Sequence, residues 1–425
     1  MIELKSDQLV FSFPEIHQDC RLTVTLHRTL RIPDDGKKYP LPPSLGKFPA
    51  IHLDDHADRV PKKWLGRGGI AIPMWQSEAM WLQFDPSTPR NNSNKWPFAV
   101  KIACGKVSAV TGKSWSKQLK VNDYLVCPLQ PWIDGFVTDE GQIKQFIAAA
   151  LGFGATVEGQ VTGKEEFGGI QLEVIPMSLE EFNNRFPAIT TSLRRGMNNG
   201  MVYISDSTGP LSYGSVSYGG SSSIVGVGSN SIATNTIGVG GSSISSLSCN
   251  TSLCSNSVQL DGAIRSVNTH DMHTQDSTVN VNYLNLDMGM GMGGRMEQQI
   301  FKDPYGLGVW SKKHKSRLFI HLCNSLGWRH LTNKEPPTVP LTAANYTSSG
   351  FPWFEYYEEN ASVQKGTSTL KKVKSVAEFS KKKKIPLLPE NQSVNIPTVQ
   401  VKIWEPKHKQ RAAKTARKSE RLSAR

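Results

Sequence analysis

Asp134 and Glu158 are the acidic side chains whose surroundings best suit general acid and base chemistry. Two carboxyl groups on either side of a glycosidic bond can protonate the leaving group and activate a nucleophile. Gln130, Trp132 and Gln160 lie close by in the sequence, and amide groups beside an indole ring suit a sugar or another small polar ligand. These residues define a hydrolase hypothesis in which the distance between the two carboxyl groups is still open.

Tryptophan is concentrated in the same part of the chain. Six of the ten tryptophans lie within the 69 residues from Trp64 to Trp132. Polar residues such as Gln83 and Lys101 lie between them, as they would in a site for a small polar ligand. The alternative, which we favour, is that the rings fill a β core and that their N–H groups bond to the backbone.

Residues 111–114, with the sequence Thr-Gly-Lys-Ser, resemble the end of a phosphate-binding loop. Such a loop needs a glycine five positions before its second glycine, so that backbone N–H groups can surround the phosphates. That position is Val107. We therefore expect a β-hairpin turn here and no nucleotide site.

His52 and His56 are the candidates for a metal site, because they would face the same side of a helix and imidazole nitrogens bind zinc. Three aspartates lie among and after them, so a helix start or a solvated loop explains this segment equally well. We expect neither a metal nor a cofactor.

The positive charge of the chain is concentrated near its C-terminal end. Residues 371–425 hold 16 of the 49 basic residues and 4 of the 36 acidic ones, so they contribute +12 of the net +13. Such blocks of like charge repel each other and favour a disordered tail, which could make weak contact with a polyanion such as nucleic acid. The candidate contacts are Lys381, Lys382, Lys383, Lys384, Lys407, Arg411, Lys414, Arg417 and Lys418.

Residues 207–260 contain no acidic residue, no basic residue and no histidine. Serine, glycine, asparagine and threonine dominate, and this composition cannot bury enough apolar surface to offset the entropy of the chain. We predict a disordered low-complexity insertion over residues 201–286. A short β-solenoid is the ordered alternative, and self-association through the segment would give a homo-oligomer.

Alternating apolar and polar residues, separated by glycine and proline, predict β-strands over much of the remaining chain. The predicted fold is therefore mainly β, an antiparallel sandwich or barrel-like body with a few short helices. Strands are expected near residues 22–26, 79–84, 100–104, 124–126, 156–161, 170–175, 295–301 and 318–322.

Two helices are predicted within this body. Ser178 and Glu181 have the spacing of a capping box at the start of the first helix. The second is expected at residues 324–331. Residues 353–359 should pack as the last element of the body, and residues 399–404 should dock as a strand of the tail.

Five segments follow from these patterns. Residues 1–21 form an N-terminal extension, and the β-rich body is divided into residues 22–200 and 287–370. The insertion 201–286 separates its two parts, and the basic tail 371–425 follows.

Membrane insertion and secretion are not expected from the composition. No window of about 18 apolar residues is present, and the first seven residues include acids where a signal peptide needs basic residues. The six cysteines are scattered, as reduced thiols would be. We expect a soluble intracellular protein in the cytoplasm, with the nucleus as the alternative for a eukaryotic chain.

Several sequence blocks point to a family resemblance. The blocks are residues 68–81, 123–135, 145–152, 156–163, 168–171, 293–298, 303–304, 336–337 and 352–354. They are similar to a family of uncharacterised conserved bacterial proteins, notably from actinobacteria. The resemblance covers roughly residues 22–176 and 287–375, and it implies one folded body on both sides of the insertion. It implies no activity, cofactor or site residue, and the insertion and the tail depart from its pattern.

The leading hypothesis is a non-enzymatic binding or structural protein, because the chain has no recognisable motif for a serine or cysteine nucleophile. Its body would bind a small polar ligand or a protein partner, and its tail would add weak contact with a polyanion. One alternative is a hydrolase that acts on a sugar or another small polar substrate. The other is a protein that self-assembles through the Ser/Gly segment.

Overall fold

The computed structural model describes residues 1–76, 78–187, 287–342, 344, 347, 349–358, 361–384 and 398–402. The predicted Ser/Gly insertion lies outside the described residues, and so does most of the predicted tail after Lys384. The described parts on the two sides of the insertion belong to one compact unit and share one apolar core.

Antiparallel β-structure dominates this unit, which confirms the predicted fold class. Sixteen strands form one sheet. They are β1 (Ile2–Lys5), β2 (Gln8–Ser12), β3 (Arg21–Thr29), β4 (Lys38–Tyr39), β5 (Ile51–His52), β6 (Ile70–Pro73), β7 (Ala79–Pro86), β8 (Phe98–Cys104), β9 (Val107–Ser108), β10 (Leu125–Cys127), β11 (Trp132–Ile133), β12 (Gly135–Asp139), β13 (Gln142–Ala150), β14 (Ile170–Pro176), β15 (Asp287–Glu297) and β16 (Ser316–Cys323).

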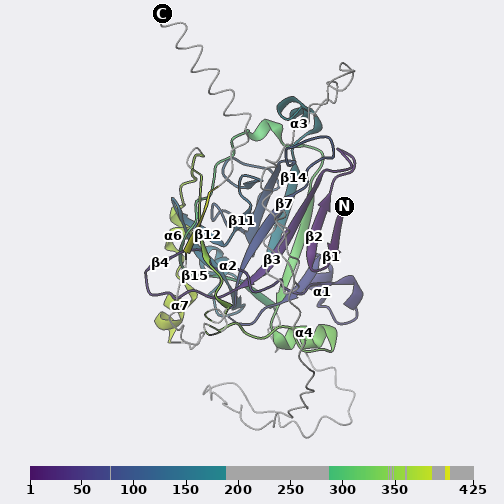
Figure 1. Cartoon of the computed structure of the whole chain (residues 1–425). Coiled ribbons are helices and arrows are strands. Elements are labelled where there is room, and N and C mark those ends of the chain that lie inside the picture. Colours follow the sequence, from purple (N-terminus) through teal and green to yellow (C-terminus); the bar gives the residue numbers. More distant parts are fainter. Residues whose placement is uncertain are drawn as a thin grey trace, which may run out of the picture. The chain divides into compact units, whose positions relative to one another are not determined.

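The sheet encloses its own core. Its main path runs β1-β2-β3-β7-β13-β15-β16-β14-β8-β10, and the shorter strands pair with members of this path (Figure 1). Leu82 and Phe84 of β7 point into the same apolar cluster as Val100 and Ile102 of β8, although the two strands are far apart in this order. Because every second residue of a strand faces the same side, the intervening residues of β8, β14 and β16 lie on the outer face.

Glycine allows strand β15 to lie close to its neighbours. The strand was predicted at residues 295–301, but it includes the glycine-rich residues 288–294 and ends at Glu297. A Cβ added at Gly291 would overlap Cγ2 of Val376, which belongs to helix α7 (Val376–Lys383). The absence of a side chain therefore leaves room for this helix to pack on the sheet.

Helix α2 (Val157–Thr162) occupies the segment that was predicted to be a strand at residues 156–161, so that prediction is wrong. The hydroxyl of Thr156 accepts the N–H of Gly159 at 3.0 Å at the start of the helix. Gly163 ends it in the left-handed conformation, with φ of 79°. Caps at both ends satisfy backbone groups of the short helix, and they outweigh the alternating pattern.

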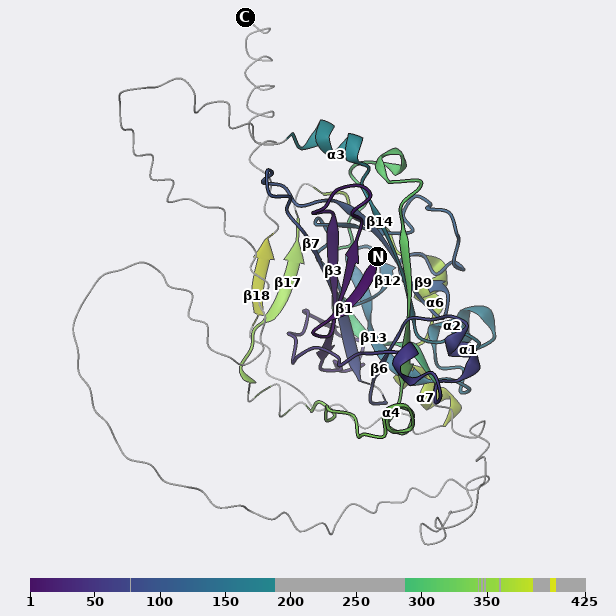
Figure 2. The same ribbon diagram turned by 90° about the vertical axis from the view of Figure 1, so that its right-hand side faces the viewer.

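The two predicted helices are confirmed. The Ser178 side chain accepts the N–H of Glu181 at the start of α3 (Leu179–Arg185), and Asn324 accepts the N–H of Gly327 at the start of α4 (Ser325–Thr332). Figures 1 and 2 show α3 and α4 near opposite ends of the strands. Three shorter helical elements among the described residues are η1 (Asp54–His56), α1 (Lys62–Leu65) and η4 (Leu307–Val309).

Residues 371–384, which the charge count assigned to the tail, are folded against the body. They include the end of α6 (Ser368–Lys372) and all of α7. The side chains of Leu370 and Val376 are 0% exposed. Lys144 Nζ donates to the carbonyl of Val373 at 3.1 Å and lies 3.6 Å from the carboxylate of Glu378. The folded body therefore extends through Lys384.

Two strands form a separate parallel pair. They are β17 (Trp353–Tyr357) and β18 (Thr398–Lys402), and they run side by side in Figure 2. Strand β18 confirms the predicted strand over residues 399–402, while residues 403 and 404 lie outside the described residues. The partner of β18 is the element predicted at residues 353–359.

Replacement of Leu370 by alanine should destabilise the whole body, because this buried side chain packs over Gly112. The expected loss is about 2–5 kcal/mol in the free energy of unfolding, measured by urea denaturation. Leu326→Ala is the matched control, since Leu326 is 47% exposed and its truncation should cost less than about 0.5 kcal/mol. Equal midpoints for the two variants would contradict the packing of this segment on the body.

Candidate functional site

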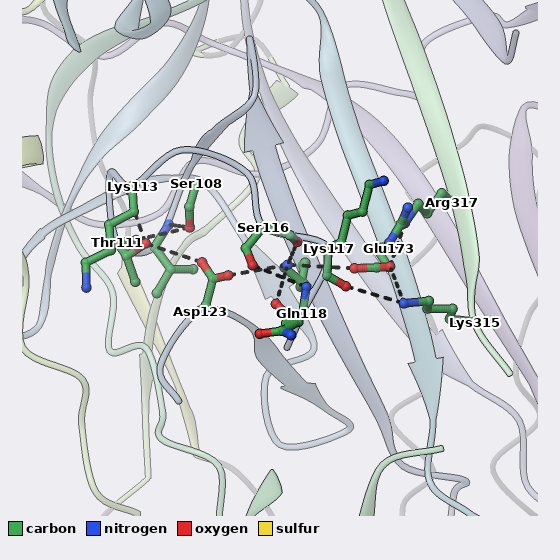
Figure 3. Close-up of polar contacts among 12 residues, drawn as sticks. Ser108, Thr111, Lys113, Ser116, Lys117, Gln118, Asp123, Glu173, Lys315 and Arg317 are labelled. Atoms are coloured by element: carbon green, nitrogen blue, oxygen red, sulfur yellow. Dashed lines mark hydrogen bonds and ion pairs between the residues drawn. The ribbon is translucent and has the colours of Figure 1, made fainter. Parts of the chain in front are cut away.

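A row of three charged residues crosses the outer face of the sheet. Lys101 of β8 is paired with Glu173 of β14, and Glu173 is paired with Arg317 of β16. Directly paired residues on neighbouring antiparallel strands lie about 5 Å apart. The register of the three strands therefore places a cation on each side of one carboxylate. Figure 3 shows Glu173 with Arg317 and Lys315 beside it.

Lys101 is the buried end of this row, with a side chain that is only 2% exposed. Its Nζ lies 3.4 Å from Asp123 Oδ2 and 3.7 Å from Glu173 Oε2. It also donates to the backbone carbonyls of Ser116 and Gln118, at 2.5 and 3.3 Å. A charged lysine in this position needs such partners, and its contacts fix residues 116–118 above the sheet.

Glu173 binds three cations. Its side chain is 0% exposed, and Oε1 accepts from Arg317 Nε at 2.6 Å and lies 3.7 Å from Lys315 Nζ. Lys315 and Arg317 are exposed at 37% and 42%, so they extend from the buried carboxylate to the solvent. The acidic group is thus hidden below basic groups that remain accessible.

Residues 111–114 form a turn beside this row, as predicted. Val107 and Ser114 form an antiparallel bridge, and Ser108 N–H donates to the carbonyl of Lys113 at 2.8 Å. Thr111 Oγ1 donates to Asp123 Oδ1 at 3.3 Å, which joins the turn to the charged row. The turn presents Lys113 to the solvent.

Phe167 organises a second group of cations on the same face. Lys106 Nζ lies 3.9 Å from the centre of the Phe167 ring, and the Arg67 guanidinium lies 5.0 Å from it. Arg67 is also 5.3 Å from the ring of Phe319. Phe319 is paired with Gln171, two residues along β14 from Glu173. These cation–π contacts extend the cationic surface along β14 and β16.

Two segments around this row contain eight basic residues and no acidic residue. They are residues 105–122 and 311–319, and they meet where Lys315 Nζ donates to the carbonyl of Lys117 at 3.4 Å. We refer to their basic side chains, together with Trp115, as the basic face. The basic side chains, all exposed, are Lys106, Lys113, Lys117, Lys120, Lys312, Lys313, Lys315 and Arg317.

Sequence reasoning missed the basic face, because the insertion separates its two segments and residues 1–370 sum to only +1. The signal that could have revealed it is the absence of acidic residues from both segments.

Asp134 is buried between strands and pairs with one amide. Gln298 Nε2 donates to Asp134 Oδ1 at 3.0 Å, and Gln298 Oε1 accepts the backbone N–H of Asp134 at 3.1 Å. Burial raises the pKa of this carboxyl to about 8, and the hydrogen bond from Gln298 opposes the shift. A raised pKa would suit a general acid, but such chemistry also needs a second carboxyl group nearby.

Glu158, the predicted second carboxyl group, holds a loop. Its carboxylate accepts the backbone N–H groups of Glu166, Phe167 and Gly168 at 3.0, 2.9 and 2.8 Å. The hydrogen bonds of Asp134 and Glu158 have no partner in common within the described part of the chain. The structure therefore does not show the two as a pair, and it explains Glu158 as the group that positions Phe167.

The predicted ligand-binding glutamines are internal links. Gln130 donates to the carbonyl of Trp132 at 3.0 Å and accepts the N–H of Phe301 at 3.1 Å. Gln160 bonds to both the N–H and the carbonyl of Lys374, at 2.9 and 3.0 Å. Their amide groups tie loops together, and these contacts do not gather them around one ligand.

The tryptophans divide between the core and the surface. Trp64 and Trp96 are buried, at 2% and 0% exposure, as the core interpretation expected. Trp132 is half-buried, with its ring 6.4 Å from that of Trp81 in an edge contact. Trp115 is half-buried too, and its ring lies 4.6 Å from Lys101 Nζ.

The two histidine candidates for a metal site do not share a helix face. His52 ends strand β5, whereas His56 ends the short η1. No group of three or more potential ligands from His, Cys, Asp and Glu occurs among the described residues. The helical geometry on which the metal hypothesis depended is therefore not formed.

The predicted polyanion contacts fall into two sets. Lys381, Lys382, Lys383 and Lys384 are exposed at the end of α7, within the folded body. Lys407, Arg411, Lys414, Arg417 and Lys418 lie outside the described residues.

No family model, no curated protein and no solved structure matches this chain. In the part that the structure describes, no helix has the length and apolar character needed to cross a membrane.

Replacement of Glu173 by glutamine should strongly destabilise the protein, because it leaves buried Lys101 short of a negative partner. Breaking a buried ion pair typically costs about 3–5 kcal/mol. Chemical denaturation measures this loss, with exposed Glu180→Gln on α3 as the matched control. A Glu173→Gln variant as stable as the control would show that the buried row contributes nothing to folding.

Asp134 should make the stability fall as the pH rises. Its pKa is about 8 in the folded state, against 3.8 for an ordinary aspartate. The folded state therefore retains a proton that the unfolded chain releases, and its contribution to stability is full below pH 3.8 and lost as the pH rises to about 8. The slope is at most about 1.4 kcal/mol per pH unit.

Asp134→Asn mimics the protonated carboxyl group and should remove this part of the pH dependence. We expect the variant to be more stable than the native protein near pH 8, by urea denaturation, with a smaller difference near pH 5. The same pH dependence in both proteins would mean that Asp134 is ionised in the folded state.

Proposed function

We propose that this protein is a non-enzymatic binding protein whose basic face binds a polyanion. The observation that supports this most directly is the concentration of exposed positive charge in two segments that meet at Lys117 and Lys315. Clustered cations attract phosphate or sulfate groups, and binding is driven by the release of counterions from the polyanion.

Part of the basic face is held in place before any ligand binds. Lys101 fixes residues 116–118 through two backbone carbonyls, and Glu173 fixes the side chain of Arg317. Binding then orders fewer flexible groups, so less conformational entropy is lost. This preorganisation applies to the backbone of residues 116–118 and to the side chain of Arg317.

The C-terminal tail has a smaller part in this proposal than its charge suggested. Residues 371–384 belong to the folded body, and they hold seven of the sixteen basic residues that were assigned to the tail. Residues 385–425 retain nine basic and three acidic residues, a net charge of +6. We propose that this remainder adds weak, salt-sensitive contact to the binding by the body.

The hydrolase alternative has less support. Asp134 and Glu158 are bonded to different parts of the protein, and Gln130 and Gln160 are engaged with the backbone. Self-assembly through residues 207–260 falls on a segment outside the described residues, so it stays a hypothesis from the sequence.

Retention of the full chain on immobilised heparin tests the proposal. The face variant replaces Lys113, Lys117 and Lys315 by glutamine. Its matched control replaces Lys5, Lys37 and Lys334, three exposed lysines outside the basic face, so that the net charge is the same. We expect the face variant to elute at a clearly lower salt concentration than this control, because it loses clustered contacts.

A third variant separates the tail from the body. It replaces Lys407, Arg411, Lys414, Arg417 and Lys418 by glutamine. We expect it to lose part of the retention and to keep the part that depends on the basic face. If retention disappears with the tail residues and the face variant elutes with its control, the basic face does not bind polyanions.

A further inference from the structure

Trp115 lies at the centre of a short basic sequence. Residues 112–120 read Gly-Lys-Ser-Trp-Ser-Lys-Gln-Leu-Lys, so Lys113 and Lys117 lie two residues to either side of the indole. Both lysines are exposed, while the tryptophan is half-buried. The loop thus combines a large aromatic ring with flanking positive charge.

One side of the indole is fixed by the protein. Lys101 Nζ lies 4.6 Å from the ring centre, and the backbone N–H of Trp115 donates to the carbonyl of Lys106 at 2.7 Å. Lys101 is itself held by Asp123 and Glu173. The cation and the backbone contact therefore set the position of a ring that is still partly open to solvent.

The indole N–H of Trp115 has no hydrogen-bond partner among the described residues. By contrast, Trp96 Nε1 donates to Met177 at 3.2 Å and Trp75 Nε1 donates to Thr338 at 3.0 Å. A tryptophan that only filled space would normally satisfy this donor when buried. Trp115 thus keeps both a donor and part of its ring for another molecule.

Phe167 differs from Trp115 in this respect. Two cations, Lys106 and Arg67, lie over its ring, so it positions basic groups and is less available for stacking. The two aromatics thus have separate roles on one surface, in which Phe167 orders cations and Trp115 presents a ring.

We infer that the basic face binds single-stranded nucleic acid, with a base stacked on Trp115 and the phosphates bound by Lys113, Lys117 and Lys315. This inference rests on the proposed function and names the class of polyanion. Unpaired bases expose their faces and stack on aromatic side chains, while lysine and arginine follow the backbone. In a duplex the bases stack on each other, so an aromatic platform gains nothing there.

The experiment uses the full chain and measures binding by fluorescence anisotropy over a range of salt concentrations. The probes are an oligothymidylate and an oligouridylate of about 15 nucleotides, which distinguish single-stranded DNA from single-stranded RNA, and a DNA duplex of equal length. We expect at least one single strand to bind more tightly than the duplex.

Two kinds of substitution should have different signatures. Trp115→Leu should weaken single-strand binding by roughly 5- to 100-fold through lost stacking, with an unchanged salt dependence and little effect on duplex binding. Lys117→Gln should lower the slope of log K against log salt concentration by about 0.7. Trp115→Phe should restore most of the affinity, because it keeps a ring.

Trp75→Leu is the matched control for Trp115→Leu, since Trp75 is a half-buried tryptophan outside the basic face. Thermal unfolding of each variant shows whether it folds. If Trp115→Leu does not fold, the fluorescence quenching of Trp115→Phe decides the question. Quenching of tryptophan fluorescence by the single strand should be smaller in Trp115→Phe than in the native protein.

The outcomes separate this inference from the proposed function. Salt-sensitive retention that depends on the basic face, without any effect of Trp115 on single-strand affinity, overturns the stacking inference and leaves polyanion binding intact. Equal affinity for duplex and single strand overturns it as well. If the face variant is retained on heparin as strongly as its control, both the stacking inference and the proposed polyanion binding by the basic face are overturned.

Discussion

The buried carboxylate of Glu173 is the group on which the outer face of the sheet depends. It lies between a cation of β8 and a cation of β16, and its side chain is 0% exposed. Three antiparallel strands must stay in register to keep this arrangement, since a shift by one residue would turn the charges to the apolar side. The carboxylate thus couples the register of the sheet to the position of the basic residues above it.

Acidic and amide side chains elsewhere hold loops in the same way. Glu165 accepts the N–H groups of Gly154 and Thr156, and Glu158 accepts three N–H groups of the loop at 166–168. Gln298 and Gln160 each bond to backbone groups far away in the sequence. In a body with few and short helices, these side chains satisfy loop N–H groups that no strand or helix partner reaches. Polar residues that look like catalytic candidates in the sequence are therefore engaged in folding.

The sequence could predict those parts of the fold that depend on local signals. The caps Ser178 and Asn324 mark their helices, because a cap bonds to a residue only three positions away. The segment 156–161 misled, since its alternation matches a strand while the cap at Thr156 makes it a helix. Contacts between distant segments could not be predicted, and both the packing of Leu370 over Gly112 and the meeting of Lys117 with Lys315 are of that kind.

The charge of the surface differs from the charge of the sequence because burial is selective. Among the described residues, seven acidic side chains but only three basic ones are buried. The described residues up to Lys384 include 37 basic and 28 acidic ones, a formal net charge of +9, so the removal of these ten groups from the surface leaves an excess of exposed cations. Buried carboxylates can be stabilised by backbone N–H groups, as at Glu158, whereas long basic side chains reach the solvent while their stems pack. A nearly balanced composition is therefore compatible with a strongly basic face, and the position of the acids decides where that face lies.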